Sequence, residues 1–171
     1  RAFRINMFGE NLENHRDFYY GNSFGVNPTL RSDFGGGTLD LSYEFLNQER
    51  FIDRGIPTGS DGKPVQSLHE HVFADSTENF STHEAHILRA IYEHELTENL
   101  NGRFTATYSD HDKLYKNVYA SGYFYSGSKG YTTSTLPVEL DGYVDTTKRK
   151  STIFSYEVDG VFETGSIIHN I

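Results

Sequence analysis

The sequence contains no cysteine and no apolar run long enough to form a membrane-spanning helix. The first absence excludes disulfide frameworks, thiolate zinc sites and cysteine nucleophiles. The second excludes a helical span, which needs about 18 or more consecutive apolar residues. A transmembrane strand needs only about 9–11 residues that are apolar at alternate positions, so a spanning barrel is compatible with a mean hydropathy of −0.59.

Basic residues are also scarce, with 15 lysines and arginines against 24 acidic residues and a net charge of −9. This is the wrong sign for a nucleic-acid partner, because such proteins bind by neutralising phosphates. Only 4 prolines and 16 glycines are present, which excludes collagen-like and proline-rich classes. Phenylalanine and tyrosine are abundant instead, at 13 and 12 residues, and both favour β-structure.

Apolar and polar residues alternate in three segments, strictly in 38–45 and also in 100–108 and 154–163, which predicts three long strands. Weaker alternation predicts two more at 3–8 and 24–34. Residues 83–96 also fit a helix, because Ile87 and Ile91 interrupt the polar side of the pattern. We assign them to a strand because the neighbouring segments are strands. The fold is therefore expected to be all-β and antiparallel.

The connections between these strands alternate in length. Short turns are expected at 35–37, 97–99 and 164–165, and long loops at Asp53–Ser81 and Tyr119–Lys150. Short turns at one end with long loops at the other are typical of outer-membrane barrels, in which the short turns are periplasmic. One face should then meet lipid, at Leu41, Tyr43, Phe104, Phe154 and Tyr156. The other should meet the lumen, at Asp40, Glu44, Arg103, Glu157 and Asp159.

Several short segments resemble one family of membrane proteins. They are Arg16-Asp17, Asn27-Pro28-Thr29-Leu30, Thr38-Leu39, Tyr43-Glu44, Asp53-Arg54-Gly55-Ile56-Pro57, Gly62-Lys63-Pro64, Tyr92-Glu93-His94-Glu95-Leu96 and Ile168-His169. In order and spacing the chain resembles TonB-dependent siderophore receptors of the ferrichrome and pyoverdine type. The resemblance implies an up-and-down transmembrane barrel of roughly 22 strands with a plugged lumen.

Residues 1–171 would supply about six strands and a fraction of that barrel, as an excerpt that starts without methionine and ends inside an apolar run. The family's plug domain and TonB-contacting box have no counterpart in them. The resemblance implies an outer-membrane receptor of a Gram-negative bacterium that takes up ferric siderophores. Its partners would be the siderophore, TonB through the plug, and outer-membrane lipid. It implies no cofactor and no enzymatic activity.

Two candidate sites follow from the loops. Asp53, Arg54, Gly55, Ile56 and Pro57 resemble the first large extracellular loop of the family, although turn chemistry alone also accounts for the glycine and proline. An aromatic cluster comprises Tyr115, Tyr119, Tyr123, Phe124, Tyr125 and Tyr131. We expect Tyr115 and Tyr119 in an interfacial girdle. Tyr123 and Tyr125 are candidate ligand-binding residues that could cover a ferric siderophore, with a girdle as the alternative.

Other chemistry has little support in the sequence. His69, His71, His83, His86 and His94 invite a metal interpretation, but a fourth ligand is missing, and His83 and His86 would point to opposite faces of a strand. No nucleophile elbow, phosphate loop or zinc-protease motif is present. Two rival interpretations are a passive porin-like barrel and a soluble β-sandwich that binds carbohydrate or protein.

Overall fold

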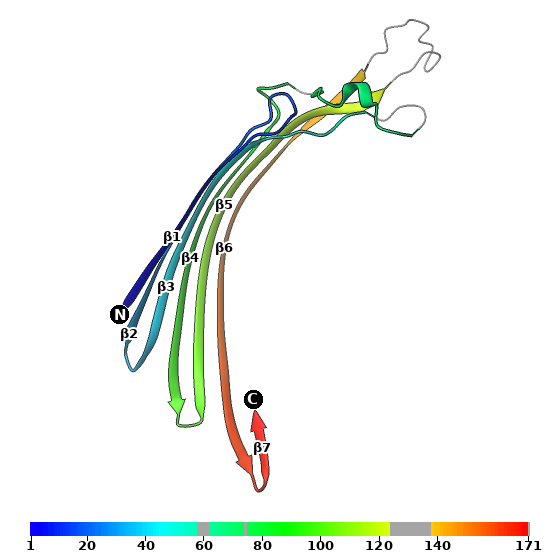
Figure 1. Ribbon diagram of the computed structural model, residues 1–171. Coiled ribbons are helices and arrows are strands. Elements are labelled where there is room, and N and C mark those ends of the chain that lie inside the picture. Colours follow the sequence, from blue (N-terminus) through cyan, green and yellow to red (C-terminus); the bar gives the residue numbers. More distant parts are fainter. Residues whose placement is uncertain (58–61, 74, 124–137, 171) are drawn as a thin grey trace, which may run out of the picture.

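The computed structural model describes residues 1–57, 62–73, 75–123 and 138–170, and the description of side chains further omits residues 122, 123 and 138. These residues form one antiparallel sheet in which each strand pairs with the next along the chain (Figure 1). The seven strands are β1 (Ala2–Leu12), β2 (Gly21–Phe34), β3 (Gly37–Phe51), β4 (Phe80–Thr97), β5 (Leu100–Tyr123), β6 (Val138–Thr164) and β7 (Ile167–Asn170). The expectation of an all-β, antiparallel, up-and-down arrangement is confirmed.

The turns at one end of the sheet are as short as the sequence predicts. Gly35 and Gly36 join β2 to β3 with φ values of +59° and +85°. A two-residue hairpin turn of this hand needs positive φ at both positions, which glycine adopts without steric cost. Residues 98–99 and 165–166 make the corresponding turns after β4 and β6, and all three turns lie at the same end of the sheet (Figure 1).

The strand assignment of residues 83–96 is confirmed, because all of them lie in β4 between β3 and β5. The predicted bounds of the second long loop, Tyr119–Lys150, are wrong. Residues 119–123 continue β5 and residues 138–150 belong to β6, and the two strands pair from Leu100–Gly160 to Tyr123–Val138. The alternation of apolar and polar residues stops near Tyr108, because the side chains on that face of β5 change from apolar to charged. The backbone pairing with β6 continues beyond this point.

The two faces of the sheet differ as the alternation predicts. A hollow of about 550 Å³ on one face is lined by Asp40, Ser42 and Glu44. A smaller hollow of about 300 Å³ is lined by Leu30, Leu41 and Tyr43. Successive side chains in a strand point to opposite sides, so Asp40 and Leu41 lie on different faces. We call these the polar face and the apolar face.

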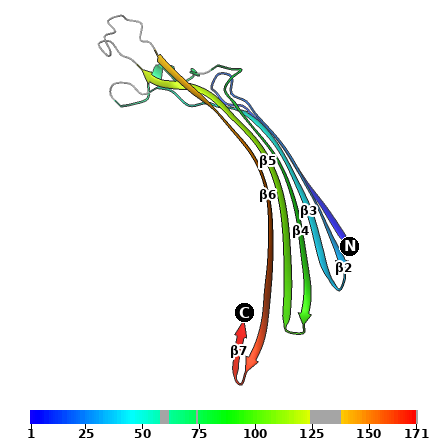
Figure 2. The same ribbon diagram turned by 180° about the vertical axis from the view of Figure 1, so that it is seen from behind.

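The sheet is a single curved layer, and no second layer covers either face in the described residues (Figures 1 and 2). Large apolar side chains are correspondingly exposed, for example Phe3 at 81% and Phe154 at 68%. The buried residues gather where the loops meet the strand ends, and they include Phe51, Ile52 and Asn79. The core of this chain therefore lies at the loop end of the sheet.

Between β3 and β4 a single helical turn, η1 (Gln66–Leu68), interrupts the loop. Among the described residues, no helix has the length and apolar character needed to cross a membrane.

Candidate ligand-facing region at the loop end

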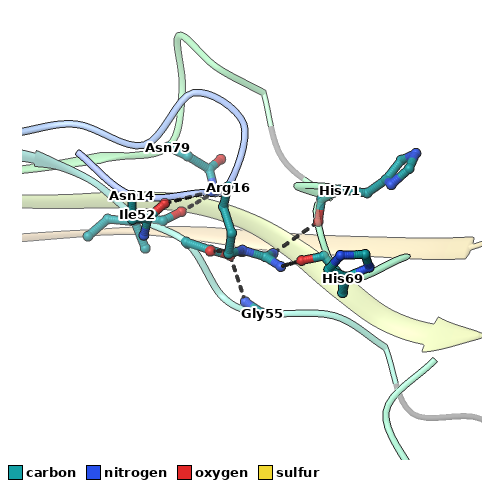
Figure 3. A network of polar contacts seen from close by, with 8 residues as sticks. Asn14, Arg16, Ile52, Gly55, His69, His71 and Asn79 are labelled. Atoms are coloured by element: carbon teal, nitrogen blue, oxygen red, sulfur yellow. Dashed lines mark hydrogen bonds and ion pairs between the residues drawn. The ribbon is translucent and has the colours of Figure 1, made fainter. Parts of the chain in front are cut away.

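Arg16 joins the two described loops at this end of the sheet (Figure 3). Its Nε and Nη2 atoms donate to the two carboxylate oxygens of Asp53. Nη1 donates to the carbonyl of His69 at 2.7 Å, and Nη2 also donates to the carbonyl of His71 at 2.9 Å. Both charged side chains are largely buried, with exposures of 11% and 14%. The β1–β2 loop is thus fixed to both halves of the β3–β4 loop.

The loop that begins at Asp53 has the turn chemistry that the sequence predicts. The Gly55 amide donates to Asp53 Oδ1 at 2.8 Å, and Gly55 has a φ of +82°. Pro57 is buried, and its carbonyl accepts the Val65 amide at 3.1 Å. Ile56 is half-buried beside it. These contacts give Asp53, Gly55 and Pro57 structural roles in shaping the loop.

Asn79, a fully buried residue that no sequence pattern marks, connects the end of β3 and the start of β4 to β5. Its side-chain amide donates to the carbonyls of Ile52 and Val118 at 3.1 and 2.7 Å. Its side-chain oxygen accepts the Val118 amide at 2.9 Å. A buried polar group is stable when its hydrogen bonds are satisfied, as they are here. A single asparagine before an apolar strand gives no sequence signal for this role.

Arg54 leaves the loop and lies against tyrosines of β5 and β6. Its guanidinium carbon is 4.8 Å from the ring centre of Tyr119 and 6.0 Å from that of Tyr143. Tyr115 stacks on Tyr143 with ring centres 5.8 Å apart. Hydrogen bonds to Tyr115 and Tyr143 raise the pKa of Arg54 above its ordinary value. Cation–π contacts of this kind hold a charged side chain over an aromatic surface.

The girdle predicted for Tyr115 and Tyr119 is wrong, because a girdle requires the apolar face. Strand β5 keeps its register from Leu100 to Ala120, so both tyrosines lie on the same face as Arg103. They form instead an aromatic surface on the polar face. Tyr125 lies outside the described residues, and for Tyr123 only the backbone, within β5, is described. Their ligand-binding role stays a prediction.

Ion pairs cross the polar face from strand to strand. Arg31 of β2 pairs with Asp40 of β3, and Arg103 of β5 pairs with Glu93 of β4. Ile87 and Ile91 lie among these charges and line the hollow of about 550 Å³. The polar face is thus a charged surface with apolar patches, which suits contact with both water and another protein surface.

The apolar face has a limit at which charge begins. On β5 and β6 the apolar positions end at Tyr108 and Thr152, and the next two positions carry ion pairs. Lys150 lies 3.2 Å from Asp110, and Lys148 lies 2.8 Å from Asp112. On the first three strands, apolar residues continue at Met7, Val26 and Phe45, and on β2 also at Phe24. The limit of the apolar belt therefore steps between β3 and β4.

The candidate histidines lie at separate places in the fold. His83 stacks on His111 with ring centres 5.5 Å apart, and His86 stacks on Tyr43 on the opposite face with ring centres 6.1 Å apart. The carbonyls of His69 and His71 accept hydrogen bonds from Arg16. Within the described residues, no three potential ligands gather around a common point. The predicted opposition of His83 and His86 is confirmed.

No family model matches the chain, and no curated protein is similar to it in sequence. Its fold is similar to the solved structure of the ferric-catecholate import receptor Fiu from Escherichia coli K12, with a TM-score of 0.76 and 18% sequence identity. The match covers 98% of this chain and 26% of that receptor, so the chain spans about a quarter of its length. At this identity the likeness shows the fold: the sheet matches a stretch of a receptor barrel.

Proposed function

We propose that this chain is part of the transmembrane barrel of a TonB-dependent receptor that imports ferric siderophores across the outer membrane of a Gram-negative bacterium. The observation that carries the proposal is the apolar belt. On β6 the alternate positions from Thr152 to Phe162 are uncharged, a stretch of the length that a tilted strand needs to cross the hydrocarbon layer. Charged residues begin directly beyond it.

The uncovered apolar belt supports a membrane barrel over a soluble sheet. Its large side chains are exposed, for example Phe154 at 68% and Tyr156 at 53%. In a membrane barrel, such a face meets lipid. A soluble sandwich would instead cover this face with a second sheet.

A plugged receptor is favoured over a passive porin by the polar face. A water-filled channel would be lined by polar residues, whereas Ile87 and Ile91 place two branched apolar side chains in the hollow beside Asp40 and Glu44. Such a mixed surface supports contact with a folded plug. The cargo would be a ferric siderophore, TonB would act through the plug, and no residue of this chain would perform covalent catalysis.

Cysteine labelling, with the unsubstituted receptor as the background control, tests the proposed placement, and residues 1–171 contribute no cysteine to that background. In the complete receptor, Ser67→Cys in the exposed β3–β4 loop should react with a membrane-impermeant maleimide on intact cells. Glu98→Cys in the short turn after β4 should react only after the outer membrane is permeabilised. Equal labelling of both positions on intact cells would contradict the membrane topology.

Transport is tested in the same strain by uptake of radiolabelled iron. We expect uptake of a ferric siderophore in cells that carry the receptor and TonB, and loss of uptake in an isogenic strain without TonB. Uptake that continues without TonB would favour the passive porin.

A further inference from the structure

Two histidines and two cations lie together on the polar face near the loop end. His83 of β4 is opposite Lys113 of β5, and His111 of β5 is opposite Arg149 of β6. The imidazoles connect the two rows, because His83 Nε2 lies 3.2 Å from His111 Nδ1 and the rings stack. We call these four residues the basic cluster. Lys113 and Arg149 are exposed on the polar face.

Neither cation of the basic cluster has an acidic partner in the part of the chain that the structure describes. Asp145 is one step further along the same face, opposite Tyr115, and no ion pair joins it to Lys113. The neighbouring row toward the short turns is neutral, with Ser109 and Ser151 hydrogen-bonded at 2.7 Å. The basic cluster therefore has positive charge that this sheet does not neutralise.

On the apolar face of the same strands, by contrast, the cations have acidic partners. Lys148 and Lys150 flank Arg149 in sequence but point to the apolar side, and each has an aspartate of β5 within ion-pair distance. The charges of these two lysines are thus neutralised within the sheet, whereas those of Lys113 and Arg149 are not. Adjacent unpaired positive charges repel one another and are stabilised by a bound anion.

The hydrogen bond between the imidazoles limits their charge. One ring nitrogen must be an unprotonated acceptor, so at most one of the two rings is protonated while the bond persists. The pair leaves other ring nitrogens as donors or acceptors beside the two cations. Such a combination of fixed charge and hydrogen-bond donors suits an anion whose charge is spread over several oxygens.

We propose that the basic cluster binds an anionic, oxygen-rich ligand, and that it selects anionic ferric chelates over neutral ones as cargo. The second part rests on the function proposed above. Three catecholates bring more negative charge than a ferric ion can neutralise, whereas three hydroxamates only balance it. A catecholate-type complex would therefore gain from Lys113 and Arg149, and a hydroxamate-type complex would not.

The test uses the complete receptor in detergent and two double variants. Lys113→Gln with Arg149→Gln removes the charge of the cluster. Lys148→Gln with Lys150→Gln removes the same charge from the opposite face and is the matched control. Calorimetry with pyrophosphate, a compact polyanion, measures the anion site without iron. We expect about a tenfold to hundredfold weaker affinity in the cluster variant and wild-type affinity in the control.

A third variant tests whether a loss of binding comes from misfolding rather than from the loss of charge. Lys113→Arg with Arg149→Lys keeps both charges and should retain pyrophosphate binding, and heat-modifiable migration should show assembled barrels for all variants. The same proteins are then titrated with iron(III) catecholate and iron(III) acetohydroxamate complexes. The cluster variant should lose affinity for the catecholate complex alone.

Equal pyrophosphate affinity in the wild type and the cluster variant, or no binding by the wild type, would overturn the anion site. Equal loss of both iron complexes in the cluster variant would overturn the charge selection. Cluster-dependent pyrophosphate binding in a receptor that binds neither iron complex would uphold the anion site and refute the proposed function.

Discussion

Arg16 is the residue that holds the described loops together. Its guanidinium satisfies one carboxylate and two backbone carbonyls that come from the β3–β4 loop, 37 to 55 residues further along the chain. An arginine suits this position because its planar group offers several donors in a fixed arrangement. Lysine carries the same charge but cannot reach three acceptors in this geometry.

Replacing Arg16 by alanine should open the β3–β4 loop. It leaves the largely buried carboxylate of Asp53 without its cation, a loss of about 3 kcal/mol for a pair of this kind. Hydrogen exchange of the Val65 and His71 amides in the complete protein measures the opening. We expect exchange to become about a hundredfold faster.

Arg31→Ala is the matched control. Arg31 also pairs with an aspartate, but its side chain is 61% exposed and lies on the strands rather than in the loops. Exchange at Val65 and His71 should stay as in the wild type. Unchanged exchange in Arg16→Ala itself would show that the loops hold together by other contacts.

The strands illustrate what the sequence can predict and where it fails. The alternation in 38–45, 100–108 and 154–163 predicted three strands, and the structure confirms each within a longer element. The extensions were missed because they lie beyond the apolar belt, where Asp110 pairs with Lys150 across 40 residues of sequence. Pairing between residues so far apart produces no periodic pattern in the local sequence.

In the loops, too, local features were predicted from the sequence and contacts between distant residues were not. The turn roles of Gly55 and Pro57 were predicted from the sequence, because their backbone requirements are local. The partners of Arg54 and Asn79 were not predicted, because Tyr143 and Val118 approach them only after the strands have paired. The basic cluster is likewise a product of register between β4, β5 and β6.

A positive charge on the apolar belt should destabilise the barrel far more than one on the polar face. Phe104 lies within the belt of β5 opposite Tyr156, and Thr105 is its neighbour on the polar face. Phe104→Arg should cost about 2–4 kcal/mol if this position lies near the bilayer midplane. Thr105→Arg should cost much less, because its side chain stays in a polar environment.

Urea titration of the complete protein folded into phospholipid vesicles measures both variants. The midpoint should fall for Phe104→Arg and stay close to the wild-type value for Thr105→Arg. Equal shifts would mean that the two faces do not meet different solvents, and would argue against a membrane position for this sheet.

The whole sheet leaves much apolar surface uncovered. The outer edge of β1 has no partner strand in the described residues, and side chains such as Ile5 and Met7 are 56% and 68% exposed. Unpaired strand edges and large apolar surfaces both promote association. The described sheet therefore depends on a surrounding environment that supplies further strands, lipid or both.

Residues 1–171 expressed alone should consequently not form a stable monomer in detergent-free buffer. Sedimentation velocity should show large, heterogeneous assemblies, and a mild detergent should reduce their size. A monodisperse monomer that unfolds cooperatively would contradict this expectation and would support the soluble sandwich.

The unbroken register of β4 with β5 also limits how the length of this protein could vary. The pairs run without a shift from Phe80–Lys116 to Glu95–Asn101. A single inserted residue inside either strand, unless it is held in a bulge such as the one between Glu95 and Thr97, would turn every later side chain to the opposite face. The charged residues of the polar face would then lie among the apolar residues of the other face. Changes of length are therefore expected chiefly in the loops, whose residues take no part in this register.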